Sequence, residues 1–152
     1  MKIWVDADAC PKPVRAILIR TADRLKINLV FVSNQFHRIP ESGFVKTLQV
    51  PGGFDVADEY IINEVSVSDL VITSDIPLAS VIVQKNAFVL TPYGKFYSAD
   101  NINNALSVRN LKMELKSAGH EIGGQSSFSQ KDREKFANQL DGFLRRMKTN
   151  IE

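Results

Sequence analysis

The chain has 152 residues, a formal net charge of +2, and 44% hydrophobic against 24% charged residues. These values are typical of one soluble globular domain and exclude a disordered chain, and so small a net charge does not by itself indicate nucleic-acid binding. A single cysteine, and the lack of a secretory signal or an apolar run of about 18 residues, favour a cytoplasmic protein with no intramolecular disulfide and no membrane span.

The first hundred residues alternate between apolar runs and helical patterns. The predicted strands are 2–5, 27–33, 44–50, 70–73 and 87–90, and the predicted helices are 12–26, 55–65 and 77–84. Two of the strands, 27–33 and 70–73, are nearly unbroken in apolar residues, which is typical of strands covered on both faces. Alternating strands and helices predict an α/β fold with a mostly parallel sheet and right-handed crossovers.

The pattern changes after Pro92. Residues 93–97 read as a loop or short hairpin, and helices are predicted over 100–118 and 129–146. We expect a single domain that spans 1–152. Within it, residues 1–97 would form the α/β core and residues 98–152 an appended helical layer.

The first strand ends in two acids, Asp6 and Asp8, that are one residue apart. Residues two apart on a strand share a face, and the carboxyl ends of strands are where open α/β sheets bind ligands. At about 4 Å and an effective dielectric near 20, the two carboxylates would repel each other by roughly 4 kcal/mol. A metal ion, a basic partner or a shared proton must offset that repulsion.

Three further aspartates are expected near the same edge of the sheet. Asp55 and Asp58 open the helix after a Pro-Gly-Gly turn, and Asp75 follows the fourth strand. Hard oxygen ligands of this kind suit Mg²⁺ or Mn²⁺, and metal-bound water attacking a phosphodiester is the natural chemistry for such a site. A zinc site is not indicated, because His37 and His120 are isolated in the sequence.

Simpler structural interpretations compete for three of these acids. Asp55 and Asp58 could favour the positive end of a helix dipole, and Asp75 could be an N-cap. No capping position explains both Asp6 and Asp8, so the functional interpretation is favoured for that pair.

Other candidate residues are expected to be structural. Asp69 precedes a strand and is expected to be a turn residue, and Cys10 a small buried apolar residue. Arg109, Lys112 and Lys116 have helical spacings of three and four. They could face a phosphate backbone, but a solvated helix face is the favoured interpretation.

Several segments together resemble the YaiI/YqxD family of bacterial proteins, which is considered similar to PIN and NYN nuclease domains. The matching segments are 5–11, 53–58 and 69–79, with weaker matches at 101–102, Arg109 and 128–133. The resemblance implies a PIN-like three-layer α/β sandwich with acids around a Mg²⁺ or Mn²⁺ site, extended here by C-terminal helices.

The resemblance also implies roles for particular residues. In those nucleases one acid ends the first strand, and Asp6 matches it. A second group comes from the helix after a Gly-rich approach, matched by Asp55 and Asp58, and a further acid follows the fourth strand, matched by Asp75. Asp8 is additional to the simplest nuclease pattern.

The leading hypothesis is a metal-dependent nuclease that acts on RNA. Asp6, Asp8, Asp55 and Asp75 would hold the metal, and Asp58 would join Asp6 in catalysis by orienting water. One alternative is a small-molecule phosphohydrolase of the haloacid dehalogenase type, in which Asp6 is the nucleophile and Asp8 the general acid. Another is a non-catalytic module that holds metal for structure and binds RNA or protein through its C-terminal helices.

Overall fold

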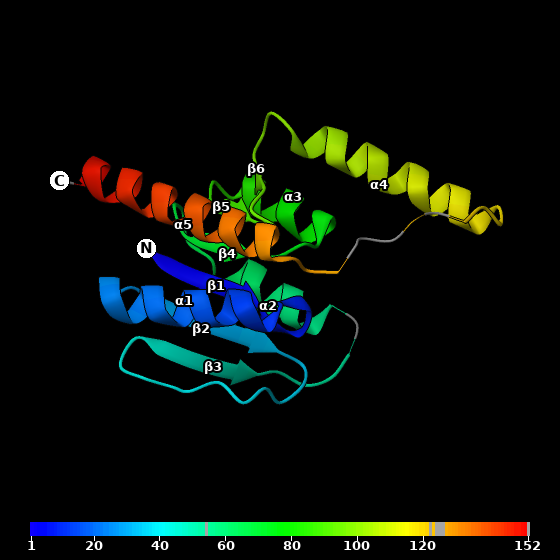
Figure 1. Ribbon diagram of the computed structural model, residues 1–152. Helices are drawn as coiled ribbons and strands as arrows, with labels where there is room; N and C mark the ends of the chain where they lie inside the picture. Colours follow the sequence, from blue (N-terminus) through cyan, green and yellow to red (C-terminus); the bar gives the residue numbers. More distant parts are fainter. Residues whose placement is uncertain (54, 122, 124–126, 152) are drawn as a thin grey trace.

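The computed structural model describes residues 1–53, 55–121, 123 and 127–151, which form three layers around one sheet (Figure 1). The strands are β1 (Lys2–Asp6), β2 (Asn28–Ser33), β3 (Val45–Gln49), β4 (Leu70–Ile72), β5 (Phe88–Leu90) and β6 (Phe96–Tyr97). The helices are the 3₁₀ turn η1 (Ala7–Ala9), α1 (Lys12–Leu25), α2 (Val56–Glu64), α3 (Ile76–Gln84), α4 (Ile102–Ser117) and α5 (Gln130–Ile151). Among the described helices, none combines the length and apolar character that a bilayer crossing requires.

The six strands lie in the order β3-β2-β1-β4-β5-β6. All neighbours are parallel except β5 and β6, which form the short antiparallel hairpin. The predicted α/β class, the mostly parallel sheet and the three-layer sandwich are therefore confirmed. Because the strand order reverses between β1 and β4, the carboxyl ends of these two strands border the crevice where such sheets bind ligands.

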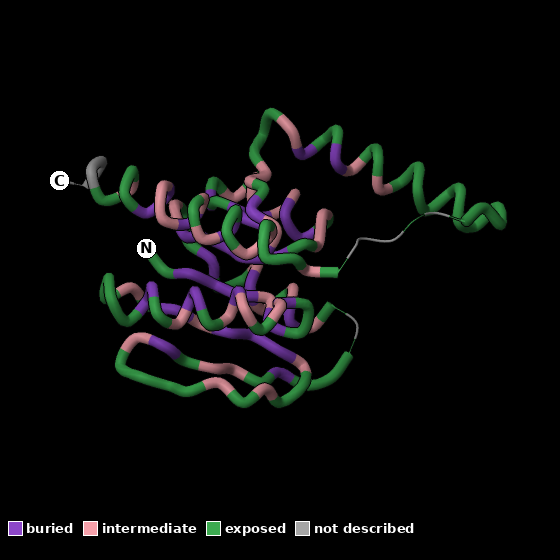
Figure 2. Tube along the Cα trace, viewed as in Figure 1, coloured by how far each residue is buried: buried purple, intermediate pink, exposed green. Residues whose placement is uncertain are grey.

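Both faces of the sheet are covered, which explains the unbroken apolar strands. Side chains alternate along β1: Ile3 and Val5 join the core under α1 and α5, whereas Trp4 joins the core under α2 and α3. Figure 2 shows the resulting buried band through the centre of the sheet. The central position of β1 thus fixes where its last residue, Asp6, emerges.

The helices begin where the sequence predicts. Pro13 lies in the first turn of α1 and Pro77 in the first turn of α3, where a missing amide hydrogen leaves no intrahelical acceptor unpaired. Asp75 is the N-cap of α3, and its Oδ1 accepts a hydrogen bond from the Leu78 amide at 2.9 Å. The N-cap interpretation of Asp75 is therefore confirmed, although its position also places it at the end of β4.

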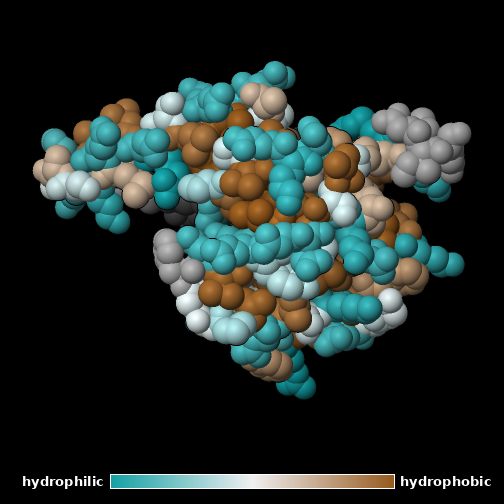
Figure 3. All heavy atoms as spheres, turned by 180° about the vertical axis from the view of Figure 1, so that it is seen from behind, coloured by the Kyte–Doolittle hydropathy of each residue, from teal (hydrophilic) through white to brown (hydrophobic). Residues whose placement is uncertain are grey.

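The two C-terminal helices pack differently. α5 lies beside α1 and adds four side chains to the core: Phe136, Leu140, Phe143 and Leu144. α4 packs on α3 and then projects from the body, with exposed apolar side chains such as Leu111 and Met113 on its outer part (Figures 1 and 2). Seen from behind, apolar atoms gather at the centre of the molecule and recur along this projection (Figure 3).

The hairpin of β5 and β6 is held close against α5. Gly94, in the turn between the strands, has φ +86, and a Cβ there would lie 2.7 Å from Lys135 Cγ and 3.0 Å from the Phe136 amide nitrogen. The rings of Phe96 and Phe143 add a contact with centroids 5.5 Å apart. Only glycine fits this turn without moving it away from α5.

Asp69 joins the starts of β1 and β4. It is 5% exposed, and its carboxylate accepts hydrogen bonds from the Lys2 amide at 2.9 Å, the Trp4 indole at 3.1 Å and the Ser66 amide at 2.9 Å. Asp69 lies in the expected turn, but its side chain reaches residues more than 60 positions away. It therefore fixes the register of two central strands.

We expect Asp69→Ala to lower the free energy of unfolding by about 3 kcal/mol, because it removes the acceptor of the buried Trp4 indole and of two partly buried backbone amides. Urea unfolding followed by circular dichroism measures this loss. Asp100→Ala is the control, since its carboxylate makes no hydrogen bond with the described residues. A loss below about 1 kcal/mol for Asp69→Ala would contradict the structural role.

Candidate carboxylate site

Asp6 and Thr73 lie opposite each other, one residue beyond the last pair of β1 and β4. Val5 pairs with Ile72, so the next positions on each strand are Asp6 and Thr73. The Thr73 hydroxyl donates to Asp6 Oδ2 at 3.2 Å and accepts from the Asp75 amide at 3.0 Å. Thr73 is only 2% exposed, so one buried hydroxyl links the two acids that end these strands.

Asp6, Asp58 and Asp75 act on one another electrostatically, although they come from β1, α2 and the segment after β4. Burial first, then the charges of Asp75, Asp6 and Asp55, and a hydrogen bond with Asp75, raise the pKa of Asp58 to about 7. Burial also raises the pKa of Asp6; the Thr73 hydrogen bond opposes this, and the Asp75 and Asp8 charges reinforce it. Asp6 and Asp75 therefore both lie close enough to Asp58 to affect its titration.

Among the described residues, no ion pair offsets this negative charge. Within the part of the chain that the structure describes, the ion pairs involve Asp8 and Asp141, and none involves Asp6, Asp58 or Asp75. Carboxylates this close can remain together only if one holds a proton or a cation binds among them. These acids could therefore either share a proton or hold a cation.

The carboxylate of Asp8 holds the loop after β2, although its charge still acts on Asp6. The Asp8 carboxylate accepts from the Asn34 amide at 2.7 Å and the Gln35 amide at 3.3 Å, and it pairs with His37 Nε2 at 3.0 Å. The guanidinium of Arg15 lies 3.2 Å from His37 Nδ1. Burial would raise the pKa of Asp8, but these hydrogen bonds outweigh it and lower the pKa.

Asp55 lies at the N-cap position of α2 but forms no capping hydrogen bond with its side chain. Its backbone is left-handed, with φ 63, and its side chain is exposed. The charge of Asp55 contributes to the raised pKa of Asp58. Asp55 therefore borders the cluster and affects it through its charge.

The donor set suits a hard divalent cation. Among the described residues, no three His, Cys, Asp or Glu side chains are placed as a ready metal-binding group. The carboxylate oxygens of Asp6, Asp58 and Asp75 are nevertheless the ligand type that Mg²⁺ and Mn²⁺ take. Asn34 Oδ1 is also buried with no hydrogen-bond partner in the described part of the chain, and its amide contacts Asp8.

The structure also defines the surroundings of Cys10 and Thr73, two uncharged residues near the site. Cys10 is buried, and burial raises the pKa of its thiol to about 12, which confirms it as a small buried side chain. Sequence reasoning treated Thr73 only as a strand residue. The available signal was a hydroxyl that ends an otherwise apolar buried strand two residues before Asp75.

Stability without metal should fall as pH rises through the Asp58 titration. The folded pKa of about 7 lies above the ordinary value of 3.8, so the unfolded chain releases this proton first. Stability from this group is full below about pH 4 and is lost toward pH 7. Calorimetric melting in EDTA at pH 4.5, 6 and 8 should show a smaller fall for Asp58→Asn than for the wild type and for the matched control Glu59→Gln. Parallel melting curves for all three would contradict the coupling.

Thr73→Val should raise the pKa of Asp6 further, because the Thr73 hydrogen bond stabilises the ionised carboxylate. Thr73→Ser, which keeps a hydroxyl, should leave the pKa close to that of the wild type. NMR titration of the aspartate side-chain carbons measures both shifts. An unchanged Asp6 pKa in Thr73→Val would show that this hydrogen bond has no effect on the site.

Comparisons with known proteins agree over nearly the whole chain. Residues 4–146 match the family described as "Uncharacterized BCR, YaiI/YqxD family". A UPF0178 protein of Maridesulfovibrio salexigens is 53% identical over 99% of this chain and all of its own length. UPF0178 proteins of a Janthinobacterium strain and of Shewanella baltica are each 49% identical, over 98% and 96% of this chain and 99% and 97% of their own lengths. No solved structure matches. The chain therefore belongs to the YaiI/YqxD family.

Proposed function

We propose that this protein is a metal-dependent nuclease that hydrolyses phosphodiester bonds of RNA, with Mg²⁺ or Mn²⁺ bound at the carboxylate site. One observation carries the proposal: at the point where the strand order reverses, burial and the charges of Asp75 and Asp6 raise the pKa of Asp58, and burial and the charge of Asp75 raise that of Asp6. No cationic side chain of the described residues pairs with them. The similarity to PIN and NYN nuclease domains that the sequence resemblance implies would favour the same chemistry.

The proposed ligands are Asp6 and Asp75, which end neighbouring strands and share the Thr73 hydroxyl. A bound divalent ion would lower the pKa of a water molecule and neutralise charge on the phosphate. Asp8 and Asp55 remain predicted ligands, although the hydrogen bonds of Asp8 to the loop favour a positioning role for it. Thr73 would keep the Asp6 carboxylate in one orientation.

Asp58 is the proposed general base. With a pKa of about 7, its carboxylate is partly ionised near neutral pH and can accept a proton from an attacking water. A bound cation would lower this pKa and increase the ionised fraction. Asp58 lies in the first turn of α2, whose N-terminal dipole also favours the ionised form.

The phosphohydrolase alternative receives less support from the geometry. It requires Asp8 to be a protonated general acid near Asp6, but hydrogen bonds from Asn34, Gln35 and His37 lower the pKa of Asp8. A carboxylate that accepts three hydrogen bonds is held in its ionised form at neutral pH. Asp8 is better suited to hold the loop than to donate a proton.

The test combines metal binding with RNA cleavage. We expect calorimetry to detect Mn²⁺ binding to the wild type, and a labelled mixed-sequence single-stranded RNA to be cut in Mn²⁺ but not in EDTA. Asp6→Asn should lose both, with cleavage reduced about 100-fold or more, because it removes a proposed ligand. Asp100→Asn is the matched control for charge and should behave as the wild type.

Other outcomes would contradict the proposal in distinct ways. Mn²⁺ binding without RNA cleavage would favour the non-catalytic module, and a trapped phosphoaspartate at Asp6 would favour the phosphohydrolase. No Mn²⁺ binding to the wild type would mean that shared protons alone hold the carboxylates together. Full cleavage by Asp6→Asn would exclude the proposed mechanism.

A further inference from the structure

We propose that a basic groove between α4 and the β5–β6 hairpin binds the phosphates of a single-stranded RNA and leads that strand to the carboxylate site. That the bound RNA is then cleaved rests on the proposed function, because cleavage requires the nuclease activity. The binding step is independent of it and is tested separately below.

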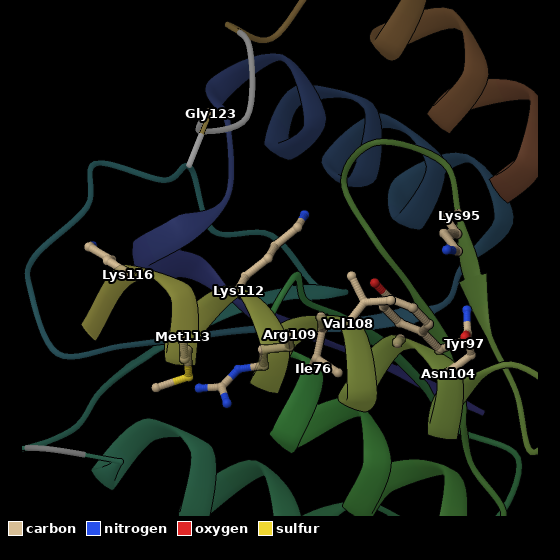
Figure 4. A pocket seen from close by; sticks show the side chains of 11 residues that line it. Ile76, Lys95, Tyr97, Asn104, Val108, Arg109, Lys112, Met113, Lys116 and Gly123 are labelled. Carbon is tan, nitrogen blue, oxygen red and sulfur yellow. The ribbon is translucent and has the colours of Figure 1, made fainter. Parts of the chain in front are cut away.

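The groove consists of two adjoining hollows of about 490 and 390 Å³. Both are lined by Ile76, Lys95, Tyr97 and Lys112, and the smaller one also reaches Ser74. Ser74 and Ile76 are the two neighbours of Asp75 in the chain. The groove therefore begins beside the carboxylate site. Figure 4 shows the side chains that line it along α4.

Its walls carry cations and no acids. Lys95 comes from the hairpin, and Arg109, Lys112 and Lys116 come from α4. No Asp or Glu is among the described residues that line either hollow, and none of the four cations forms an ion pair within the described chain. A surface helix usually pairs such charges, so this arrangement leaves positive charge available to an anion.

The side chains are arranged along one track. Figure 4 shows Lys112 extending to the side of α4 on which Lys95 lies, whereas Arg109 extends to the other side with Met113. Lys112 and Lys116 are one helical turn apart, or about 6 Å along the axis. A chain with regularly spaced negative charges would meet Lys95, Lys112 and Lys116 in sequence.

The groove also offers an aromatic face. Tyr97 is half-buried in the wall, and Lys95 Nζ lies 5.3 Å from the centre of its ring. Cations beside aromatic rings are the combination with which proteins hold single-stranded nucleic acid: the cations contact phosphates and the rings stack on bases. Hollows of about 300–1,000 Å³ hold drug-sized ligands, which is the scale of one or two nucleotides.

The position of the groove also meets an electrostatic need of the proposed site. The clustered aspartates repel a polyanion, and surface charges act over only about 8 Å at physiological ionic strength. Cations that retain RNA for cleavage should therefore lie near the carboxylates, and Lys95 and Lys112 line a hollow that reaches both chain neighbours of Asp75. The structure assigns the groove, rather than the carboxylates, most of the affinity for RNA.

The experiment measures binding where cleavage cannot occur. Fluorescence anisotropy of a labelled 12-nucleotide oligo(U) is recorded in EDTA at several salt concentrations, with the wild type and Lys112→Gln/Lys116→Gln. The double variant should bind at least tenfold more weakly at 0.1 M salt. The slope of log K against log salt should become shallower by about 1.4, or about 0.7 for each lost phosphate contact.

The control Lys26→Gln/Lys46→Gln makes the same charge change outside the groove and should bind within about twofold of the wild type. Lys95→Gln alone should reduce the slope by about 0.7. Thermal melting of each variant shows whether the fold is retained.

Each outcome decides the inference. Equal weakening by the groove and control variants would overturn it, as would failure of the wild type to bind the oligonucleotide. Equal affinity for a duplex of the same length would overturn the single-strand assignment. Groove-dependent binding with no cleavage in Mn²⁺ would support the groove and refute the proposed nuclease. Cleavage that the groove variants leave unchanged would support the nuclease and refute the groove.

Discussion

The register between β1 and β4 is the constraint on which the candidate site depends. Asp69 fixes it at the start of both strands by accepting hydrogen bonds from the Lys2 amide and the Trp4 indole. Three residue pairs later the strands end, and the same register brings Asp6 opposite Thr73. A shift of one residue would turn the Asp6 side chain to the opposite face of the sheet. The buried carboxylate of Asp69, at the starts of β1 and β4, therefore determines where Asp6 lies at the opposite edge of the sheet.

The two kinds of carboxylate illustrate opposite uses of the same group. Asp69 and Asp8 have hydrogen-bond donors around them and stabilise local structure. Asp6 and Asp58 are partly buried with other acids around them, and burial first, then those charges, raises their pKa values. The second arrangement costs stability at neutral pH when no cation is bound. Such an unfavourable local arrangement is typical of binding and catalytic sites, whose geometry serves function rather than folding.

Sequence patterns predicted the fold well because burial on both faces leaves long apolar runs, and proline marks the starts of α1 and α3. The convergence of Asp6 with Asp75 followed from parallel strands alone, since it needs only the strand order. The hydrogen-bond partners of Asp8 and Thr73 could not be predicted, because they lie 26 to 67 residues away in the sequence. Lys112 and Lys116 are exposed, as predicted for a solvated helix face, but the sequence could not show that Lys95 of the hairpin lines the same hollow.

The close approach of Gly94 to α5 has a consequence for how the sequence can change. The turn at Gly94 carries Lys95 and leads into Tyr97, yet its position is limited by Lys135 and the Phe136 backbone on a helix that does not line the groove. A larger side chain at position 94 would displace the turn, and only a compensating change at position 135 could relieve part of the overlap. Positions 94 and 135 should therefore evolve as a dependent pair, with the shape of the basic groove as the trait that links them.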